Sequence, residues 1–187
     1  TDVTLTGDMV GMYQDDPEFS NVLGSFNYYL MVNTSKDGYD NKDLRQAIAY
    51  AIDRESLCTN VLNDGSTPAY NMVMKGLVSN ADGEDFADAS GQYFQYDTEK
   101  AKELLAEAGW DGSHELVFSV PTGNSIREQA AVIIQQNLQE IGIKTKIESA
   151  DFATHLTKVR EGNYDLGLIG SGGSPDPSEC VINFKPD

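Results

Sequence analysis

Apolar positions divide the early part of the chain into a strand-like run followed by helix-like segments. Residues 26–33 read FNYYLMVN and are aromatic or apolar almost throughout, which is typical of a central strand covered on both faces. Asn41 is suited to be a helix N-cap. Apolar residues at helical spacing follow it, namely Leu44, Ala47, Ile48, Ala51 and Ile52. The spacing over 57–62 predicts a second, shorter helix directly after Asp53.

The next segment, residues 63–96, has no sustained periodicity. It contains Gly, Pro, Asn, Asp and Ser throughout, so it predicts an irregular excursion rather than a set of regular elements. An ordered loop of this length is uncommon in a compact domain and is often functional.

From Asp97 onward, predicted helices and strands alternate. The predicted elements are a helix from Asp97 to Gly109, a strand over 116–120, a helix from Ser125 to Gly142, a strand over 143–147, a helix over 152–159 and a strand over 164–169. Ser125 and Glu128 form a capping box at the start of the long helix. Its predicted inward face consists of Ile126, Ala130, Ile133, Ile134, Leu138 and Ile141.

This alternation fixes the predicted fold class. Short connections between alternating elements imply right-handed crossovers and a mostly parallel or mixed sheet flanked by helices, which is an α/β fold. No periodic element is visible after Ile169, and we expect the chain to be cut there rather than finished.

Composition limits the possible partners. The 187 residues include 30 acidic and 13 basic side chains, and the formal charge of -17 repels a phosphate backbone or an anionic lipid surface. Acidic residues scattered over every segment are typical of a soluble surface. No stretch approaches the roughly 18 apolar residues of a membrane helix, and the start TDVTLTGDM is not a signal peptide. We expect one soluble domain over 1–187 that does not bind nucleic acid.

Motifs for nucleotide, metal and redox chemistry are not found. Residues 169–174 follow a predicted strand but lack the Gly-Lys-Ser/Thr of a P-loop, and the prolines after them exclude a dinucleotide fingerprint. The acidic cluster over 82–88 lacks the ligand pattern of a calcium loop, and we interpret it as a solvated loop. Cys58 and Cys180 are far apart, and neither belongs to a CxxC pair.

Catalytic residues are not indicated either. His114 and His155 have no neighbouring ligands at metal spacing, and we expect both on the surface. No serine lies in a Gly-x-Ser-x-Gly elbow. The sequence therefore predicts neither an enzyme nor a cofactor or metal site.

The glycine-rich segment after the last predicted strand is the first candidate for binding. Its backbone N–H and C=O groups can be approached closely by another chain, and ligands of open α/β sheets lie beyond the carboxyl ends of strands. Gly and Pro in this segment are equally typical of a surface loop or linker, so both interpretations stay open.

Three segments carry a resemblance to a known family. They are YYLMVNTS followed by DLRQAIAYAIDRE within 28–55, the run YDTEKAKELLAEAGW that ends at Trp110, and LQEIGI over 138–143 together with the later Tyr164-Asp165-Leu166. In this order and over most of the chain, they resemble the family 5 extracellular solute-binding proteins. Members of that family bind oligopeptides, dipeptides, nickel complexes and related solutes.

The resemblance implies an architecture. Family members have two lobes joined by a hinge, so the chain would be one lobe of a periplasmic-binding-protein type II-like fold and a fragment of a larger parent. Residues 170–187 would be the crossover toward the first lobe of the same parent. Oligopeptide binders of the family carry an aromatic residue and an Asp here, whereas this chain has no acid until Asp176, so a peptide held by its ammonium group is not implied.

The candidate ligand contacts follow from the resemblance and from strand polarity. They are Gly170, Ser171, Gly172, Gly173, Ser174 and Asp176 in the glycine segment, Thr122 and Asn124 after an earlier strand, and Tyr70 and Asn71 in the long excursion. Plain helix capping remains the alternative for Asn124, and packing of the loop remains the alternative for Tyr70.

The function implied is capture of an extracellular oligopeptide or similar solute by lobe closure and its delivery to an ABC permease in the membrane. We expect a monomer of bacterial origin, either a cell-surface lipoprotein or a periplasmic protein. The alternatives are a sensory or adhesion module that uses the lobe for protein contact and, with less support, a small α/β enzyme.

Overall fold

A computed structural model describes residues 7–22, 24, 26–172 and 176–180. The chain forms two compact units. The sheet unit consists of Tyr28–Asp53 and Phe94–Ile169, and the loop unit consists of Thr1–Asn27, Arg54–Tyr93 and Gly170–Asp187. Strands β1 and β4 each continue from one unit into the other.

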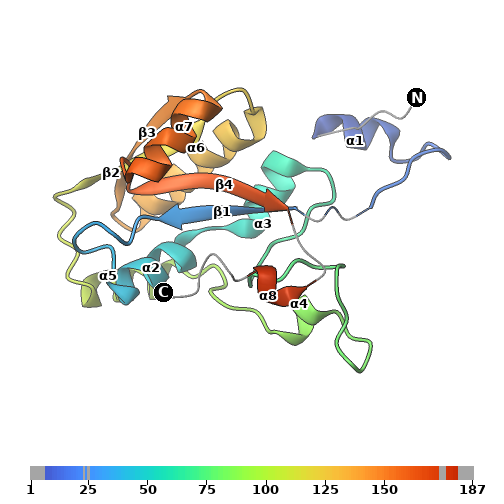
Figure 1. Cartoon of the computed structure of the whole chain (residues 1–187), viewed down its shortest axis with the longest axis horizontal. Coiled ribbons are helices and arrows are strands. Elements are labelled where there is room, and N and C mark those ends of the chain that lie inside the picture. Colours follow the sequence, from blue (N-terminus) through green and yellow to red (C-terminus); the bar gives the residue numbers. More distant parts are fainter. Residues whose placement is uncertain (1–6, 23, 25, 173–175, 181–187) are drawn as a thin grey trace. The chain divides into compact units, whose positions relative to one another are not determined.

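The described strands form one mixed sheet with the order β1-β4-β2-β3 (Figure 1). The strands are β1 (Phe26–Val32), β2 (Glu115–Pro121), β3 (Lys144–Ala150) and β4 (Leu166–Gly172). Strand β2 is parallel to both β3 and β4. Figure 1 shows β1 running opposite to β4, and the N–H of Asn33, just after β1, donates to the carbonyl of Asp165, just before β4, at 2.9 Å. The predicted α/β fold with a mostly parallel or mixed sheet is confirmed.

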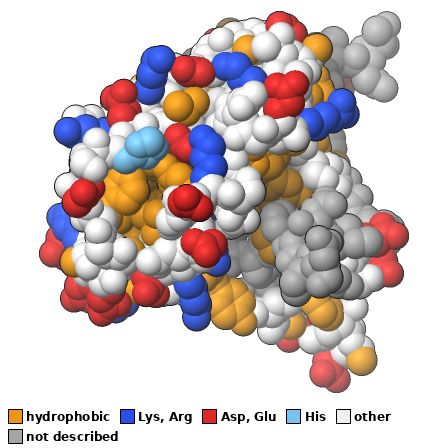
Figure 2. All heavy atoms as spheres, turned by 60° about the vertical axis from the view of Figure 1, so that its left-hand side comes forward, with side chains coloured by type: hydrophobic (Ala, Val, Ile, Leu, Met, Phe, Trp, Pro, Cys, Tyr) orange, Lys and Arg blue, Asp and Glu red, His pale blue; other side chains and the backbone are white. Residues whose placement is uncertain are grey.

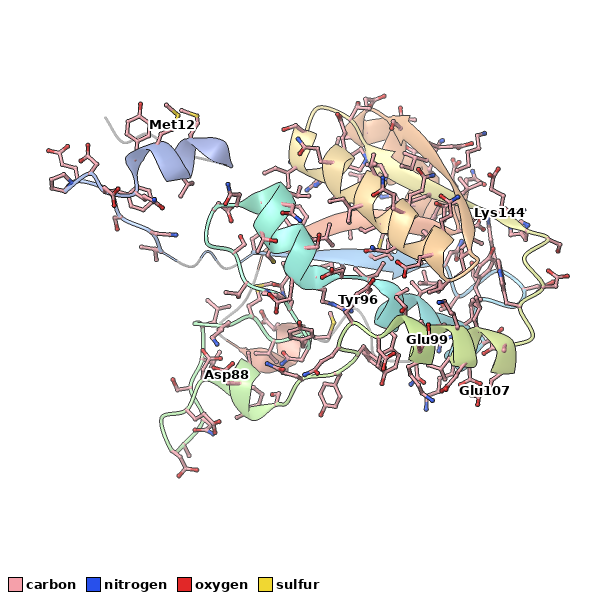
Figure 3. All side chains as sticks on the ribbon, turned by 180° about the vertical axis from the view of Figure 1, so that it is seen from behind. Met12, Asp88, Tyr96, Glu99, Glu107 and Lys144 are labelled. Atoms are coloured by element: carbon pink, nitrogen blue, oxygen red, sulfur yellow. The ribbon has the colours of Figure 1, made fainter. Side chains whose placement is uncertain are left out.

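Helices cover both faces of this sheet. They are α2 (Lys42–Ala51), α5 (Thr98–Glu107), α6 (Ser125–Glu140) and α7 (Phe152–Glu161). Figure 1 shows α7 in front of the sheet, and Figure 3, seen from behind, shows α6 in front of it. Right-handed crossovers require this arrangement, because the path from β3 to β4 runs back over β2. The largest core side chains include Phe118, Leu116, Leu138, Ile143 and Leu166.

The start of α6 differs from the sequence prediction. The N-cap is Asn124, whose side-chain oxygen accepts a hydrogen bond from the N–H of Arg127 at 3.1 Å. Glu128 instead accepts from the N–H of Gly123 at 3.0 Å, so the predicted capping box from Ser125 is wrong. Asn is as good an N-cap as Ser. Asn124 precedes Ser125, and its side chain accepts the hydrogen bond from the first helical turn, so Asn124 is the N-cap. The inward face accordingly uses the fully buried Ala131 where Ala130 was predicted.

The loop unit contains short helices and irregular chain. Its elements are α1 (Asp8–Tyr13), α3 (Arg54–Leu57), the π-helix η1 (Cys58–Leu62), α4 (Phe86–Ala89) and α8 (Pro177–Cys180). The predicted irregular excursion is confirmed, since only α4 and an isolated bridge between Ser79 and Asp85 interrupt it. The prediction that no regular element follows Ile169 is wrong, because β4 extends to Gly172 and α8 follows it. None of the helices in the described ranges has the length and apolar character needed to cross a membrane.

Candidate ligand-binding site

The carboxyl ends of β2 and β3 lie side by side in the sheet unit, and each is followed by a helix N-terminus. The N–H of Thr122 donates to the carbonyl of Ala150 at 2.7 Å, which ties the two strand ends together. Asn124 caps α6, and Asp151 caps α7 by accepting from the N–H of Thr154 at 3.1 Å. We call residues 121–128 and 150–152, together with Tyr28 at the start of β1, the carboxyl edge. Ligands of open α/β sheets bind at such edges.

Arg127 is the prominent charged group of the carboxyl edge. Its guanidinium carbon lies 5.5 Å from the ring centre of Tyr28 and 5.9 Å from that of Phe152, so three elements of the sheet unit converge on it. As whole residues, Tyr28 and Phe152 remain 38% and 50% exposed. Cation–π contacts hold a guanidinium in place without neutralising it, and each is worth about 0.5–1 kcal/mol at an exposed position.

The charge of Arg127 has no salt-bridge partner in the part of the chain that the structure describes. Its Nε atom is buried and has no hydrogen-bond partner among the described residues. A guanidinium offers several N–H donors in a fork that fits a carboxylate. The carboxyl edge therefore presents an oriented cation suited to an anionic group of a ligand.

A buried polar pair lies on the face of β2 that α7 covers. Nδ1 of His155 lies 2.9 Å from Oγ of Ser119, and both residues are 0% exposed. Burial lowers the pKa of His155, and the positive charges of Arg127 and Lys158 lower it further. The imidazole is therefore neutral at pH 7.

This position corrects one prediction and confirms another. His155 was expected on the surface, and that prediction is wrong, because the face of α7 that packs on the sheet is centred on His155 rather than on Phe152 or Leu156. His114 is exposed as predicted, with 60% of its side-chain surface accessible. A helical period counted from apolar side chains alone does not include a buried histidine. Arg127, Tyr28 and Phe152 were also missed as candidates, because nothing in their local sequence indicates that they meet.

The end of β4 belongs to the loop unit, and there Gly170 has a packing role. A Cβ atom on Gly170 would overlap the ring of Phe26 and would lie 3.3 Å from the carbonyl oxygen of Asn27. The close approach thus comes from β1 of the same chain. Ser171 and Gly172 complete the strand, and Gly172 is exposed.

The remaining residues of the glycine segment are only partly described. Gly173 and Ser174 lie outside the described residues. Asp176 accepts a hydrogen bond from the N–H of Ser178 at 2.9 Å at the start of α8. Whether any of these residues contacts a ligand stays a prediction.

Tyr70 and Asn71 hold the long excursion together within the loop unit. The Asn71 side-chain amide donates to the carbonyls of Ala87 at 2.7 Å and Gly91 at 3.1 Å, and its oxygen accepts from the N–H of Val73 at 2.9 Å.

Tyr70 has neighbours on both its ring and its hydroxyl group. Its hydroxyl donates to Glu55 at 3.2 Å, and the Arg54 guanidinium carbon lies 5.8 Å from its ring centre. These contacts support the packing alternative for Tyr70, and the ligand role of both residues stays a prediction.

Two residues from the motifs that carry the family resemblance lie at the opposite, amino edge of the sheet. Asn33 donates to the carbonyls of Gly162 at 3.1 Å and Tyr164 at 3.0 Å, which fixes the end of β1 against the start of β4. The buried carboxylate of Asp165 accepts from Nζ of Lys36 and from the N–H of Val117, both at 2.6 Å. We call these residues the amino-edge network. It stabilises the sheet.

No group of three His, Cys, Asp or Glu side chains in the described ranges is arranged to hold a metal ion. Cys58 is a half-buried free thiol whose pKa is raised to about 11, chiefly by burial, so it is not a thiolate at neutral pH. Acidic and basic side chains are interspersed over the face shown in Figure 2, as expected for a solvated surface.

Comparison with known proteins connects this architecture to a family. Heme-binding protein A of Haemophilus influenzae is 32% identical over 158 residues, which cover 82% of this chain and 28% of that protein. Oligopeptide-binding protein AppA of Bacillus subtilis is 30% identical over 158 residues, which cover 78% of this chain and 28% of that protein. The chain thus spans less than a third of the length of these relatives.

A solved structure agrees in fold over nearly the whole chain. OppA of Listeria monocytogenes bound to peptide superimposes with a TM-score of 0.85 at 27% identity, covering 98% of this chain and 38% of that one. Residues 4–186 match the family described as bacterial extracellular solute-binding proteins, family 5 Middle. The chain therefore belongs to the family 5 bacterial extracellular solute-binding proteins.

Proposed function

We propose that this chain is a ligand-binding part of the substrate-binding component of a bacterial ABC importer. Family membership supports this proposal, as do relatives whose names describe the binding of oligopeptides and heme. The ligand is an oligopeptide or a similar solute. The parent protein works outside the cytoplasm, in the periplasm or as a lipoprotein on the cell surface, and acts as a monomer.

The observation that carries the proposal is Arg127, which lies between two partly exposed aromatic residues at the carboxyl edge and has no salt-bridge partner among the residues that the structure describes. A guanidinium in this setting suits a ligand that carries a carboxylate, while the rings can pack against apolar or planar parts of the ligand. Thr122 and Asn124 from the same edge are proposed to contact the ligand as well.

In the loop unit, the proposed ligand contacts are the glycine segment from Gly170 to Ser174, Asp176, Tyr70 and Asn71. Backbone groups of a glycine segment can pair with an extended peptide in the manner of an added strand. Residues 170–187 are proposed as the crossover to the first lobe of the parent protein.

Transport requires a change of shape that the permease can recognise. In the proposed mechanism, ligand held in the cleft contacts both lobes of the parent and shifts its population toward the closed form. The closed form then delivers the ligand to the ABC permease in the membrane. The parent needs no cofactor for these steps.

The test is native mass spectrometry of the whole parent protein after incubation with an equimolar mixture of short peptides. We expect a retained peptide, and we expect Arg127→Gln to weaken its binding about tenfold or more, as is usual for loss of a charged hydrogen-bond donor. Arg160→Gln is the matched control, because Arg160 is an exposed arginine in the last turn of α7.

The possible results separate the parts of the proposal. If the parent retains neither an added peptide nor a co-purified solute, the capture of peptides is wrong. If binding is tight but equal in the wild type and in Arg127→Gln, the family role stands and the assignment of Arg127 is wrong.

A further inference from the structure

His155 is buried in a setting that leaves one of its ring nitrogens without a partner. Nδ1 shares a hydrogen bond with Ser119 at 2.9 Å, whereas Nε2 is buried and has no partner among the described residues. A buried polar atom without a partner is rare and costs stability. We therefore consider whether the unpartnered Nε2 of His155 has a functional role.

The two positive charges near His155, those of Lys158 and Arg127, differ in whether a carboxylate pairs with them. Lys158, on the same helix, is paired with Glu148 of β3 at 3.0 Å, and Glu148 also accepts from Lys146 at 3.0 Å. Arg127, from the first turn of α6, has no such pair and contacts Phe152, one turn before His155 on α7. Of the two positive charges that lower the pKa of His155, only that of Arg127 has no carboxylate partner among the described residues.

An anion at Arg127 would reverse this balance. It would neutralise the guanidinium and add a negative charge near the imidazole, and both changes favour the protonated form. We propose that Arg127 and His155 act as a linked pair, in which binding of a carboxylate at Arg127 is accompanied by proton uptake at His155. This inference rests on the proposed role of Arg127 in ligand binding.

Linkage gives the direction of the effect. If the bound state holds the proton more tightly, then carboxylate affinity must rise as the pH falls through the range in which His155 titrates. The ligand would be held more tightly in mildly acidic surroundings than at neutral pH. Ser119 and His155 would act as positioning and proton-holding groups beneath the site, without contacting the ligand.

The experiment uses the fact that the chain has two histidines, since His114 then serves as a control in the same molecule. The side-chain nitrogens of both histidines are followed by NMR between about pH 5 and 8, the range in which histidine titrates. The carboxylate probe is N-acetylglycine, and the neutral control is N-acetylglycinamide. The Nε–H resonance of Arg127 reports whether the probe binds.

We expect N-acetylglycine to shift the titration of His155 upward and to leave His114 unchanged, while the amide shifts neither. In Arg127→Gln, the titration of His155 without probe moves upward, because a positive charge has been removed, and the probe no longer affects it. Arg127→Lys retains the charge and keeps part of the response.

Two results would overturn the inference in different ways. If the Arg127 resonance responds to the probe while the titration of His155 stays fixed, the carboxylate binds without proton uptake, and the proposed role of Arg127 survives. If neither residue responds, or if Arg127→Gln responds as the wild type does, the anion site itself is wrong. Peptide capture by the parent is judged separately by mass spectrometry.

Discussion

Single residues in this chain have roles that depend on which element approaches them. Gly170 is an example of this dependence. A strand end with several glycines suggests room for a ligand, but Phe26 of β1 occupies the space beside Gly170. His155 shows the same dependence, since the burial of a polar side chain is decided by the helix face that meets the sheet.

Gly170→Ala is expected to destabilise the fold by about 1–3 kcal/mol, the usual range for overpacking. The added methyl group overlaps the Phe26 ring and is tight against the carbonyl oxygen of Asn27. Urea denaturation measures the loss. Gly24→Ala is the matched control, since a Cβ there has no neighbour within 4 Å. If clash with Phe26 is the cause, the cost falls in a Phe26→Ala background, and an unchanged cost would contradict this account.

The stability of the chain is expected to fall as the pH drops below about 6.5, the ordinary pKa of histidine. The pKa of His155 is lowered in the folded state, so the unfolded chain binds a proton that the folded chain does not. His155 thus adds no penalty above the unfolded pKa and destabilises as the pH falls toward the folded pKa. The slope cannot exceed about 1.4 kcal/mol per pH unit for one proton.

Urea denaturation at a series of pH values tests this. His155→Gln should flatten the slope between about pH 5 and 6.5, the range in which histidine titrates. Exposed carboxyl groups with a lowered pKa, such as Asp111, titrate at lower pH, so they do not affect the slope between about pH 5 and 6.5. Equal slopes in the wild type and in His155→Gln would rule out His155 as the source.

At the scale of elements, the helices and strands from Asp97 onward follow their sequence patterns, because their apolar positions and caps agree with the sheet that they pack on. The irregular excursion is also predictable from its turn-forming residues. Short elements such as α1, α4 and α8 were not predicted, since helices of four to six residues carry too few apolar positions to show a period.

The cap of α6 provides a test at this scale. Asn124→Ala is expected to cost about 1 kcal/mol in unfolding free energy, since the side-chain acceptor for the Arg127 N–H is lost. Ser125→Ala is the matched control and should change stability by only a few tenths, because Ser125 is the first helical residue and not the cap. Thermal or urea unfolding of both variants measures the difference, and the reverse ranking would restore the capping box predicted from sequence.

At the scale of the molecule, the sequence carries the fold and the family but only part of the candidate site. The resemblance rests on motifs, and within them Asn33 and Asp165 hold β1, β2 and β4 together, which is why short patterns suffice to recognise the fold. The cluster of Tyr28, Arg127 and Phe152 is assembled from three distant segments. No spacing along the chain encodes that meeting, so only the tertiary structure reveals it.

The isolated chain is expected to bind the parent's ligand weakly or undetectably in comparison with the parent. It spans 28% of two relatives, and a ligand contacted from one side alone is not enclosed as in a closed pocket. Calorimetry of the chain and of the parent with the same purified ligand compares the two affinities. Equal affinities would mean that the chain contains the whole site and that closure of a second lobe adds little.

The separation of the amino-edge network from the carboxyl edge has a practical consequence for engineering. Substitutions that test the proposed ligand contacts of the sheet unit can be confined to residues 122–128 and 150–152, while the bonds of Asn33 and Asp165 keep the strands in register. A library that keeps the helix caps Asn124 and Asp151 also leaves the amino-edge network intact, and segments from relatives with other preferences could be transplanted between strand ends. Variants of this scaffold that bind a chosen solute could then serve as biosensors.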